Sequence, residues 1–142
     1  MRRGTTLLEL VMALTFVGLL GVLAAPRFTD ALDQLAVRRA VSEASVFYGA
    51  ARFGAILRGS PVRIEFGPDS MIAVYERDTD SLFLRRDGPS KDRVRLRASR
   101  PVIRILPTGI GSGGANTTLV FTRGVHAESL TTSRLGRLRK WR

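Results

Sequence analysis

The distribution of apolar and polar residues divides the chain into three stretches. Residues 5–25 are almost entirely apolar and contain a single charged residue, Glu9. From Arg27 to about Arg58, apolar residues recur at spacings of three and four, which predicts an amphipathic helix. From Pro61 onward the spacing changes to two, which predicts short strands. The pattern therefore predicts an α+β protein, in which one long helix precedes a small antiparallel β domain.

The helix is expected to be continuous from Thr5 to about Arg58. Gly18 and Pro26 weaken it locally, and Pro26 should bend it or remove one backbone hydrogen bond. The sequence Arg58-Gly59-Ser60-Pro61 should end it. Apolar residues that we expect to face the sheet are Phe28, Leu32, Leu35, Ala36, Ala40, Ala44, Phe47, Ala51 and Ala55. The opposite face is expected to carry the charged residues Arg27, Asp30, Asp33, Arg38, Arg39, Glu43 and Arg52.

The rest of the chain, residues 59–142, should form the β domain. We expect one antiparallel sheet laid on the apolar face of the helix. The predicted strands are Val62–Phe66, Met71–Glu76, Leu82–Arg86, Arg93–Ala98, Val102–Leu106, Thr118–Thr122, Ser129–Thr132 and Leu138–Trp141. Glycine, proline and asparagine mark the intervening turns, including a predicted loop at Pro107–Asn116.

The apolar stretch 5–25 is long enough to cross a membrane, since about 20 helical residues span a bilayer core of ~30 Å. Arg2 and Arg3 precede it, which favours a cytoplasmic N-terminus and a C-terminal domain on the other side. Glu9 lies inside this stretch. A carboxylate in an apolar helix costs a few kcal/mol and is usually retained for function. Alternatively, Glu9 lies at the membrane interface, where it costs little.

The net charge of +11 is concentrated in the last third of the chain. Residues 1–90 hold 11 basic and 10 acidic side chains, whereas residues 91–142 hold 12 basic and 2 acidic ones. Such an excess suggests a polyanionic partner, nucleic acid or anionic lipid. The alternative is a generally arginine-rich composition, but that should affect both parts of the chain alike. There is no cysteine, so disulfides and thiolate metal sites are excluded.

The sequence offers no catalytic or cofactor-binding constellation. His126 is the only histidine, so no convincing zinc site is available, and we expect it at the surface. The glycines at 109, 111 and 114 have the spacing of a dinucleotide-binding loop, but the segment after them is of strand type and no βαβ unit precedes them. We therefore predict no enzyme activity, metal, cofactor or small-molecule substrate.

Two basic segments are candidates for nucleic-acid contact. Strict alternation in Arg93–Arg97 predicts that Arg93, Arg95 and Arg97 share one face of a strand. In the C-terminal segment, Arg137, Arg139 and Trp141 share a face if the chain is extended, and Arg134, Gly136 and Lys140 lie beside them. Arginine pairs with phosphate and an aromatic ring can stack on a base. Contact would be mainly with phosphates, because no recognition helix is predicted. An ordinary solvated strand face is the alternative.

The N-terminal sequence Arg3-Gly4-Thr5-Thr6-Leu7-Leu8-Glu9-Leu10 resembles the processing site of type IV pilins and type II secretion pseudopilins. The resemblance implies that residues 1–4 are a leader, removed by a prepilin peptidase between Gly4 and Thr5. It implies methylation of the new amino group of Thr5 and pairing of Glu9 with the amino terminus of a neighbouring subunit. Gly18 and Pro26 would let the helix soften inside a filament.

Residues 131–137 resemble the last hairpin of GspH/FimT domains, in which a Gly-Arg-x-Arg element recurs, here Gly136–Arg139. The resemblance implies a minor pilin or pseudopilin, held in the bacterial inner membrane and then built into a periplasmic or extracellular filament. Expected partners are other pilins, the prepilin peptidase and the inner-membrane assembly platform. The alternative function is DNA uptake, since this element contributes to DNA binding in FimT-type pilins.

Overall fold

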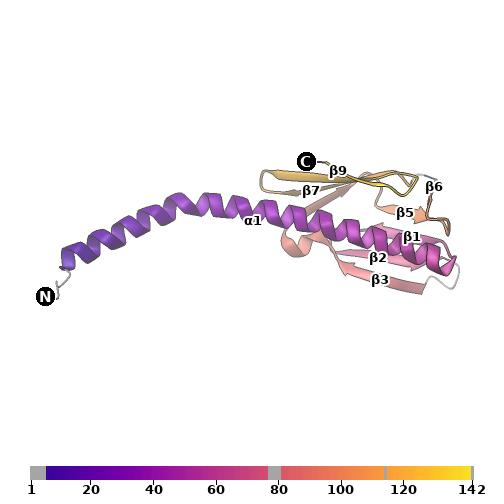
Figure 1. Cartoon of the computed structure of the whole chain (residues 1–142), viewed down its shortest axis with the longest axis horizontal. Helices are drawn as coiled ribbons and strands as arrows, with labels where there is room; N and C mark the ends of the chain where they lie inside the picture. The colour runs from indigo at the N-terminus through magenta and orange to yellow at the C-terminus, as the bar shows by residue number, and fades with distance from the viewer. Residues whose placement is uncertain (1–5, 77–80, 114, 142) are drawn as a thin grey trace.

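The computed structural model describes residues 6–76, 81–113 and 115–141. Its main helix, α1 (Leu7–Arg58), has 52 residues and begins at Thr6, whose side-chain oxygen accepts a hydrogen bond from the Glu9 amide at 3.3 Å. It ends at Gly59, which adopts a left-handed conformation (φ 59°) and so closes the last turn. The helix continues through Pro26 and curves along its length (Figure 1). The predicted continuous helix and its end are confirmed, and the predicted start at Thr5 lies outside the described residues.

The predicted α+β architecture, a long helix packed on an antiparallel β domain, is confirmed, but the strands form two sheets rather than the single sheet expected. The first has the strand order β3-β2-β1-β5-β6 and the second the order β4-β7-β8-β9. The strands are β1 (Val62–Phe66), β2 (Ser70–Tyr75), β3 (Ser81–Asp87), β4 (Arg95–Ala98), β5 (Val102–Ile105), β6 (Gly111–Ser112), β7 (Thr117–Arg123), β8 (His126–Thr132) and β9 (Leu138–Trp141). Alternation of apolar residues identifies which face of a strand is buried, but it does not identify the neighbouring strand.

The core lies where the C-terminal half of α1 meets both sheets (Figure 1). Four alanines on this face of the helix are fully covered, and they let the strands approach closely. The buried helix residues are Val37, Ala40, Val41, Ala44, Phe47, Tyr48, Ala51 and Ala55. Large residues from the sheets fill the space between them, namely Val62, Ile64, Phe66, Ile103, Ile105, Leu119, Phe121 and Leu130.

The predicted apolar face of the helix was wrong at its N-terminal end. Phe28, Leu32 and Leu35 remain 68%, 44% and 59% exposed. The first described helix residue that is buried is Val37, because before that point only the β7–β8 hairpin contacts α1, at Asp30 and Asp33, and the rest of α1 extends beyond the β domain (Figure 1). The apolar pattern continues along the helix for several residues after its cover has ended.

Most strand predictions are confirmed to within a few residues, with two corrections. A short 3₁₀ helix, Pro89–Asp92, precedes β4, and Arg93 caps it in the left-handed region at φ 57°. Arg93 is therefore not part of the strand that was predicted for it. The second correction concerns the predicted loop at Pro107–Asn116, which contains β6, a two-residue strand paired with β5.

Candidate functional site

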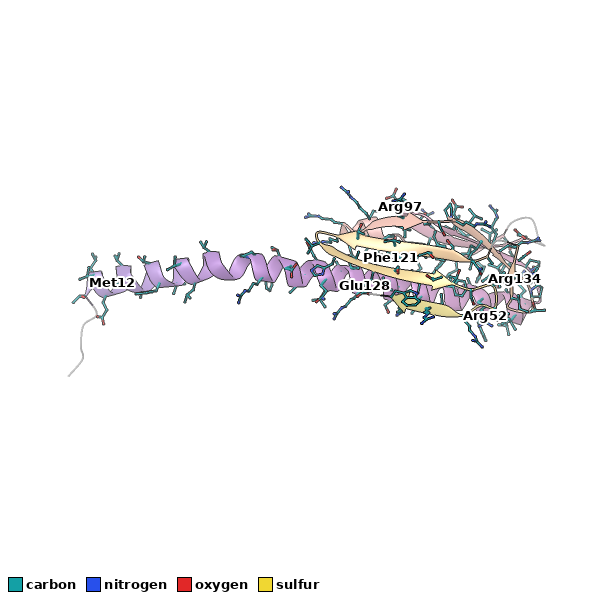
Figure 2. The ribbon with its side chains drawn as sticks, turned by 90° about the horizontal axis from the view of Figure 1, so that it is seen from above. Met12, Arg52, Arg97, Phe121, Glu128 and Arg134 are labelled. Carbon is teal, nitrogen blue, oxygen red and sulfur yellow. The ribbon has the colours of Figure 1, made fainter. Side chains whose placement is uncertain are left out.

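The N-terminal half of α1 extends away from the β domain with its apolar side chains exposed (Figure 2). Every described side chain between Thr6 and Val22 is exposed, including Leu7 at 82%, Phe16 at 66% and Leu20 at 64%. Among the described residues, α1 is the one helix long and apolar enough to span a membrane. So much exposed apolar surface on one helix requires a partner, either lipid or other helices.

Glu9 occupies the third position of α1, directly after the Thr6 cap. The sequence Thr6-Leu7-Leu8-Glu9 thus has the form of a capping box, and the Thr6 half of it is formed. A carboxylate here also interacts favourably with the positive end of the helix dipole. Sequence reasoning missed this local role, although the Thr-x-x-Glu spacing would have shown it. Glu9 is exposed, and its pairing with a neighbouring subunit stays a prediction.

The other N-terminal candidate residues are only partly placed. Gly4 and Thr5 lie outside the described residues. Gly18 is exposed, and apart from the adjacent backbone of its own helix no atom lies within 4 Å of where a side chain would begin. Pro26 lies inside α1, and its carbonyl oxygen accepts a hydrogen bond from the Thr29 hydroxyl at 2.9 Å. Softening of the helix at these two residues stays a prediction.

The outer face of the four-stranded sheet gathers basic residues from both of its edges. Residues that pair across β4, β7, β8 and β9 lie in rows on this face. One row is Arg95–Thr122–Ala127, and a second is Arg97–Val120–Ser129–Trp141. On the same face, Arg139 of β9 lies opposite Thr131 of β8. The one acidic residue of these strands, Glu128, has the opposite parity and pairs with Arg38 of the helix at 3.6 Å. The outer face of the four strands therefore carries arginine and hydroxyl groups and no carboxylate.

The basic residues form two rims rather than one patch. Arg95 and Arg97 are exposed on the edge strand β4, and Arg139 is exposed on the opposite edge strand β9 (Figure 2 labels Arg97). Three strand spacings of about 4.8 Å separate these edges, so the rims lie about 14 Å apart along the sheet. The Arg139 guanidinium lies 4.0 Å from the centre of the Trp141 ring, which confirms that these two residues share a face. Lys140 has the opposite parity and does not join them.

The turn between β8 and β9 explains the glycine of the Gly-Arg-x-Arg element. Gly136 has φ 77°, and its amide donates to the Ser133 carbonyl oxygen at 2.9 Å. A side chain at Gly136 would begin 2.6 Å from Nε of Arg52, which itself donates to the Gly109 carbonyl oxygen at 2.8 Å. Glycine is thus required by the fold here. Arg134 and Arg137 are exposed on this turn, at the end of the domain away from the free half of the helix.

The β7–β8 hairpin contacts α1 through ion pairs that sequence reasoning missed. His126 Nε2 lies 2.8 Å from Asp30 Oδ1, and Arg123 Nε lies 2.7 Å from Asp33 Oδ1. The Arg123 Nη1 group also donates to the Asp92 carbonyl oxygen at 2.5 Å. The helix face expected to be solvated therefore contacts the sheet, and His126 is half-buried rather than a surface histidine.

The hydrogen-bonded Glu43 side chain and the nearby Asp92 raise the pKa of Arg39.

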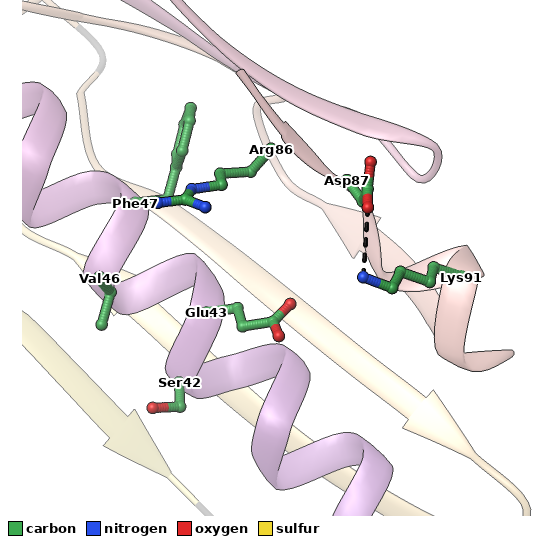
Figure 3. A pocket seen from close by; sticks show the side chains of 7 residues that line it. All are labelled: Ser42, Glu43, Val46, Phe47, Arg86, Asp87 and Lys91. Atoms are coloured by element: carbon green, nitrogen blue, oxygen red, sulfur yellow. Dashed lines mark hydrogen bonds and ion pairs between the residues drawn. The ribbon is translucent and has the colours of Figure 1, made fainter. Parts of the chain in front are cut away.

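A groove of about 260 Å³ lies between α1 and the segment around the end of β3 (Figure 3). Val46 and Phe47 provide its apolar part, and Lys91 and Asp87 pair with each other at 3.2 Å. No nucleophile and base face each other among its lining residues. Across the described residues, no three histidine or carboxylate side chains gather in a metal-binding arrangement.

Comparison with known proteins places these surfaces in a family. Residues 47–136 match the family model described as type II transport protein GspH. A fimbrial protein of Pseudomonas aeruginosa is 31% identical over 115 residues, which cover 80% of this chain and 73% of that protein.

Two solved structures share the fold. The type IV minor pilin FimU of Pseudomonas aeruginosa superposes with a TM-score of 0.62 at 13% identity, covering 72% of this chain and 86% of that one. The minor pseudopilin EpsH from the type 2 secretion system of Vibrio cholerae gives a TM-score of 0.59 at 13% identity, covering 74% and 95%.

Proposed function

Because the chain belongs to the GspH family within the type IV pilin and pseudopilin superfamily, whose members are structural subunits, we propose that it is a minor subunit near the tip of a filament. The filament is a type IV pilus or a type II secretion pseudopilus, and the similarity to a fimbrial protein favours the pilus. In this proposal residues 5–25 hold the subunit in the inner membrane, and the β domain lies outside the cytoplasm.

The exposed N-terminal half of α1 is the observation that carries this proposal. Its apolar side chains are covered by lipid before assembly and by neighbouring subunits in the filament. In either environment the carboxylate of Glu9 is costly unless a cation compensates it. Cleavage after Gly4 would create such a cation, the methylated amino group of Thr5, on each neighbouring subunit. Pairing of these two groups would fix the axial position of one subunit against the next.

Two variants of Glu9 separate its assembly role from its role at the start of the helix. Glu9→Gln keeps a side chain that can complete a capping box, and Glu9→Leu removes that capacity too. We expect both to insert into the membrane and to be cleaved, but to be missing from sheared filaments. Mass spectrometry of the amino terminus and immunoblots of the filament fraction measure these steps. Normal incorporation of Glu9→Gln would refute the pairing, and an uncleaved first methionine in cells with the peptidase would refute the processing.

A second candidate function, DNA binding during uptake, is favoured by the two-rimmed outer face of the β4-β7-β8-β9 sheet. Arg95, Arg97 and Arg139 are exposed there with no carboxylate on the same face. Arginines on both rims could pair with phosphates, while the hydroxyl groups between them and Trp141 offer hydrogen bonds and a stacking surface. Such a surface has little means to read base sequence.

A gel-shift experiment tests this second function on a fragment that begins at Arg27 and so keeps Asp30 and Asp33. Arg137→Ala with Arg139→Ala leaves the Arg95 and Arg97 rim in place and should weaken binding strongly, whereas the matched pair Arg85→Ala with Arg86→Ala, on β3 of the other sheet, should not. Affinity should fall with salt by about 0.9 logarithmic units per tenfold salt for each phosphate contact. If the fragment does not bind DNA at low salt, or if both pairs of substitutions lower the affinity equally, only the structural role would remain.

A further inference from the structure

The tip of the β7–β8 hairpin is fixed beside the part of α1 that leaves the β domain (Figure 1). The ion pairs of Arg123 with Asp33 and of His126 with Asp30 bind both sides of the tip to the helix. Between them, Gly124 has φ 58°, and a side chain there would begin 2.6 Å from Oδ2 of Asp33. The tip therefore lies directly against the helix. Val125, at its end, is 88% exposed.

Helix geometry gives the level of this tip relative to a bilayer, if residues 5–25 span it as proposed above. Nineteen helical residues from Leu7 to Ala25 cover about 28 Å, close to the ~30 Å of the hydrocarbon core. Asp30 then lies about 7 Å, and Asp33 about 12 Å, beyond the edge of the core. The headgroup layer is about 5–7 Å thick on each side. The hairpin tip is thus held at the outer edge of the headgroup layer, where it faces the lipid phosphates.

The charges around the tip are arranged so that the cations remain available. Each carboxylate near it has a basic partner: Asp30 pairs with His126, Asp33 with Arg123, and Asp92 with Arg39 at 3.8 Å. Three arginines at this end are exposed and have no carboxylate partner among the described residues. They are Arg27 on the helix, Arg93 after the 3₁₀ helix, and Arg95 opposite Thr122.

We infer that this end of the domain, the membrane-facing tip formed by Arg27, Arg93, Arg95 and Val125, binds the headgroups of anionic phospholipids. Val125 inserts among the headgroups, and the arginines pair with lipid phosphates. The contact holds the β domain against the bilayer while the subunit waits for assembly, and it is lost when the helix is extracted into the filament. A protein partner at this level would have to share the space with lipid.

The chain contains no cysteine, so single-cysteine labelling of the full-length protein tests the inference. Val125→Cys, Leu20→Cys and Leu135→Cys each carry a nitroxide in nanodiscs of phosphatidylcholine, with or without phosphatidylglycerol. Leu20 reports the bilayer core, and Leu135, 63% exposed on the β8–β9 turn, is the matched control far from the membrane. With phosphatidylglycerol, the label at 125 should be shielded from a water-soluble relaxation agent, and the label at 135 should stay fully accessible.

A variant and a phosphate control identify the ligand. Adding Arg27→Gln and Arg93→Gln to Val125→Cys should reduce the shielding in anionic discs, and free phosphate in solution should not produce shielding in neutral discs. Equal accessibility at 125 and 135 in both lipids would overturn the inference. If the label at 125 is shielded equally with and without phosphatidylglycerol, and equally after both arginine substitutions, the proposed recognition of anionic headgroups would be overturned. A label at 20 that lies outside the bilayer core would instead refute the proposed membrane insertion.

Discussion

Removing the charge of Arg123 should destabilise the β domain far more than removing that of Arg39. Both arginines form ion pairs, Arg123 with Asp33 and Arg39 with Glu43 and Asp92. The difference arises from burial. Arg123 and Asp33 have side chains 25% and 28% exposed and lie 2.7 Å apart, whereas Arg39 is 61% exposed. Exposed ion pairs contribute little because water and salt screen them and because long side chains lose entropy.

The magnitude follows from what Arg123→Met leaves behind. Methionine keeps most of the side-chain volume but loses the ion pair to Asp33 and the hydrogen bond to the Asp92 carbonyl oxygen at 2.5 Å. Hydrogen bonds from charged groups contribute about 1.5–3 kcal/mol, and partial exposure of this pair reduces that value. We expect a loss of about 2 kcal/mol in the free energy of unfolding, a substantial share of the 5–15 kcal/mol typical of a domain.

Urea unfolding of the full chain in detergent measures this loss, followed by fluorescence of the single tryptophan, Trp141, in the same sheet. Asp33→Asn and the double variant complete a cycle, whose coupling energy should be about 1 kcal/mol. Arg39→Met should shift the urea midpoint much less. The effect of Arg123 should also persist in about 1 M salt, where exposed pairs are screened. Equal midpoints for Arg123→Met and Arg39→Met would refute the argument from burial.

Two other substitutions test the polar groups of the core. Thr117→Val should lower the free energy of unfolding by about 1–3 kcal/mol, because the buried Thr117 hydroxyl accepts a hydrogen bond from the Arg100 amide and donates one to the Arg100 carbonyl oxygen. The control Thr118→Val, on the outer face of the same strand, should lower it clearly less in the same urea assay. Burial raises the pKa of Tyr48, an effect partly offset by the charge of Arg52. The stability that Tyr48 contributes is therefore complete below its unfolded pKa of about 10 and is lost as the pH rises through its folded pKa. Between about pH 9 and pH 11, the urea midpoint of Tyr48→Phe should therefore fall less than that of the wild type. A parallel fall in both proteins would contradict this origin.

Periodicity predicted the long helix, the strands and the face that Arg95 and Arg97 occupy, because these depend on neighbours along the chain. It could not predict the division into two sheets, since alternation is the same in either case. It also placed Phe28 on the covered face, because an apolar stripe does not show how far the covering sheet extends. The pairing of His126 with Asp30 joins residues 96 positions apart and follows from the fold alone.

The uncovered apolar stripe on α1 extends further than a bilayer can accommodate. Its described members, from Leu7 to Val22 and then Phe28, Leu32 and Leu35, are spread over about 43 Å of the helix, against a hydrocarbon core of ~30 Å. If residues 5–25 span a bilayer as proposed, the side chains of Phe28, Leu32 and Leu35 are left among headgroups and water. A bundle of parallel helices of equal length has no such mismatch and can bury the whole stripe. In the proposed assembly, the surplus length would favour transfer of the subunit from lipid into such a bundle.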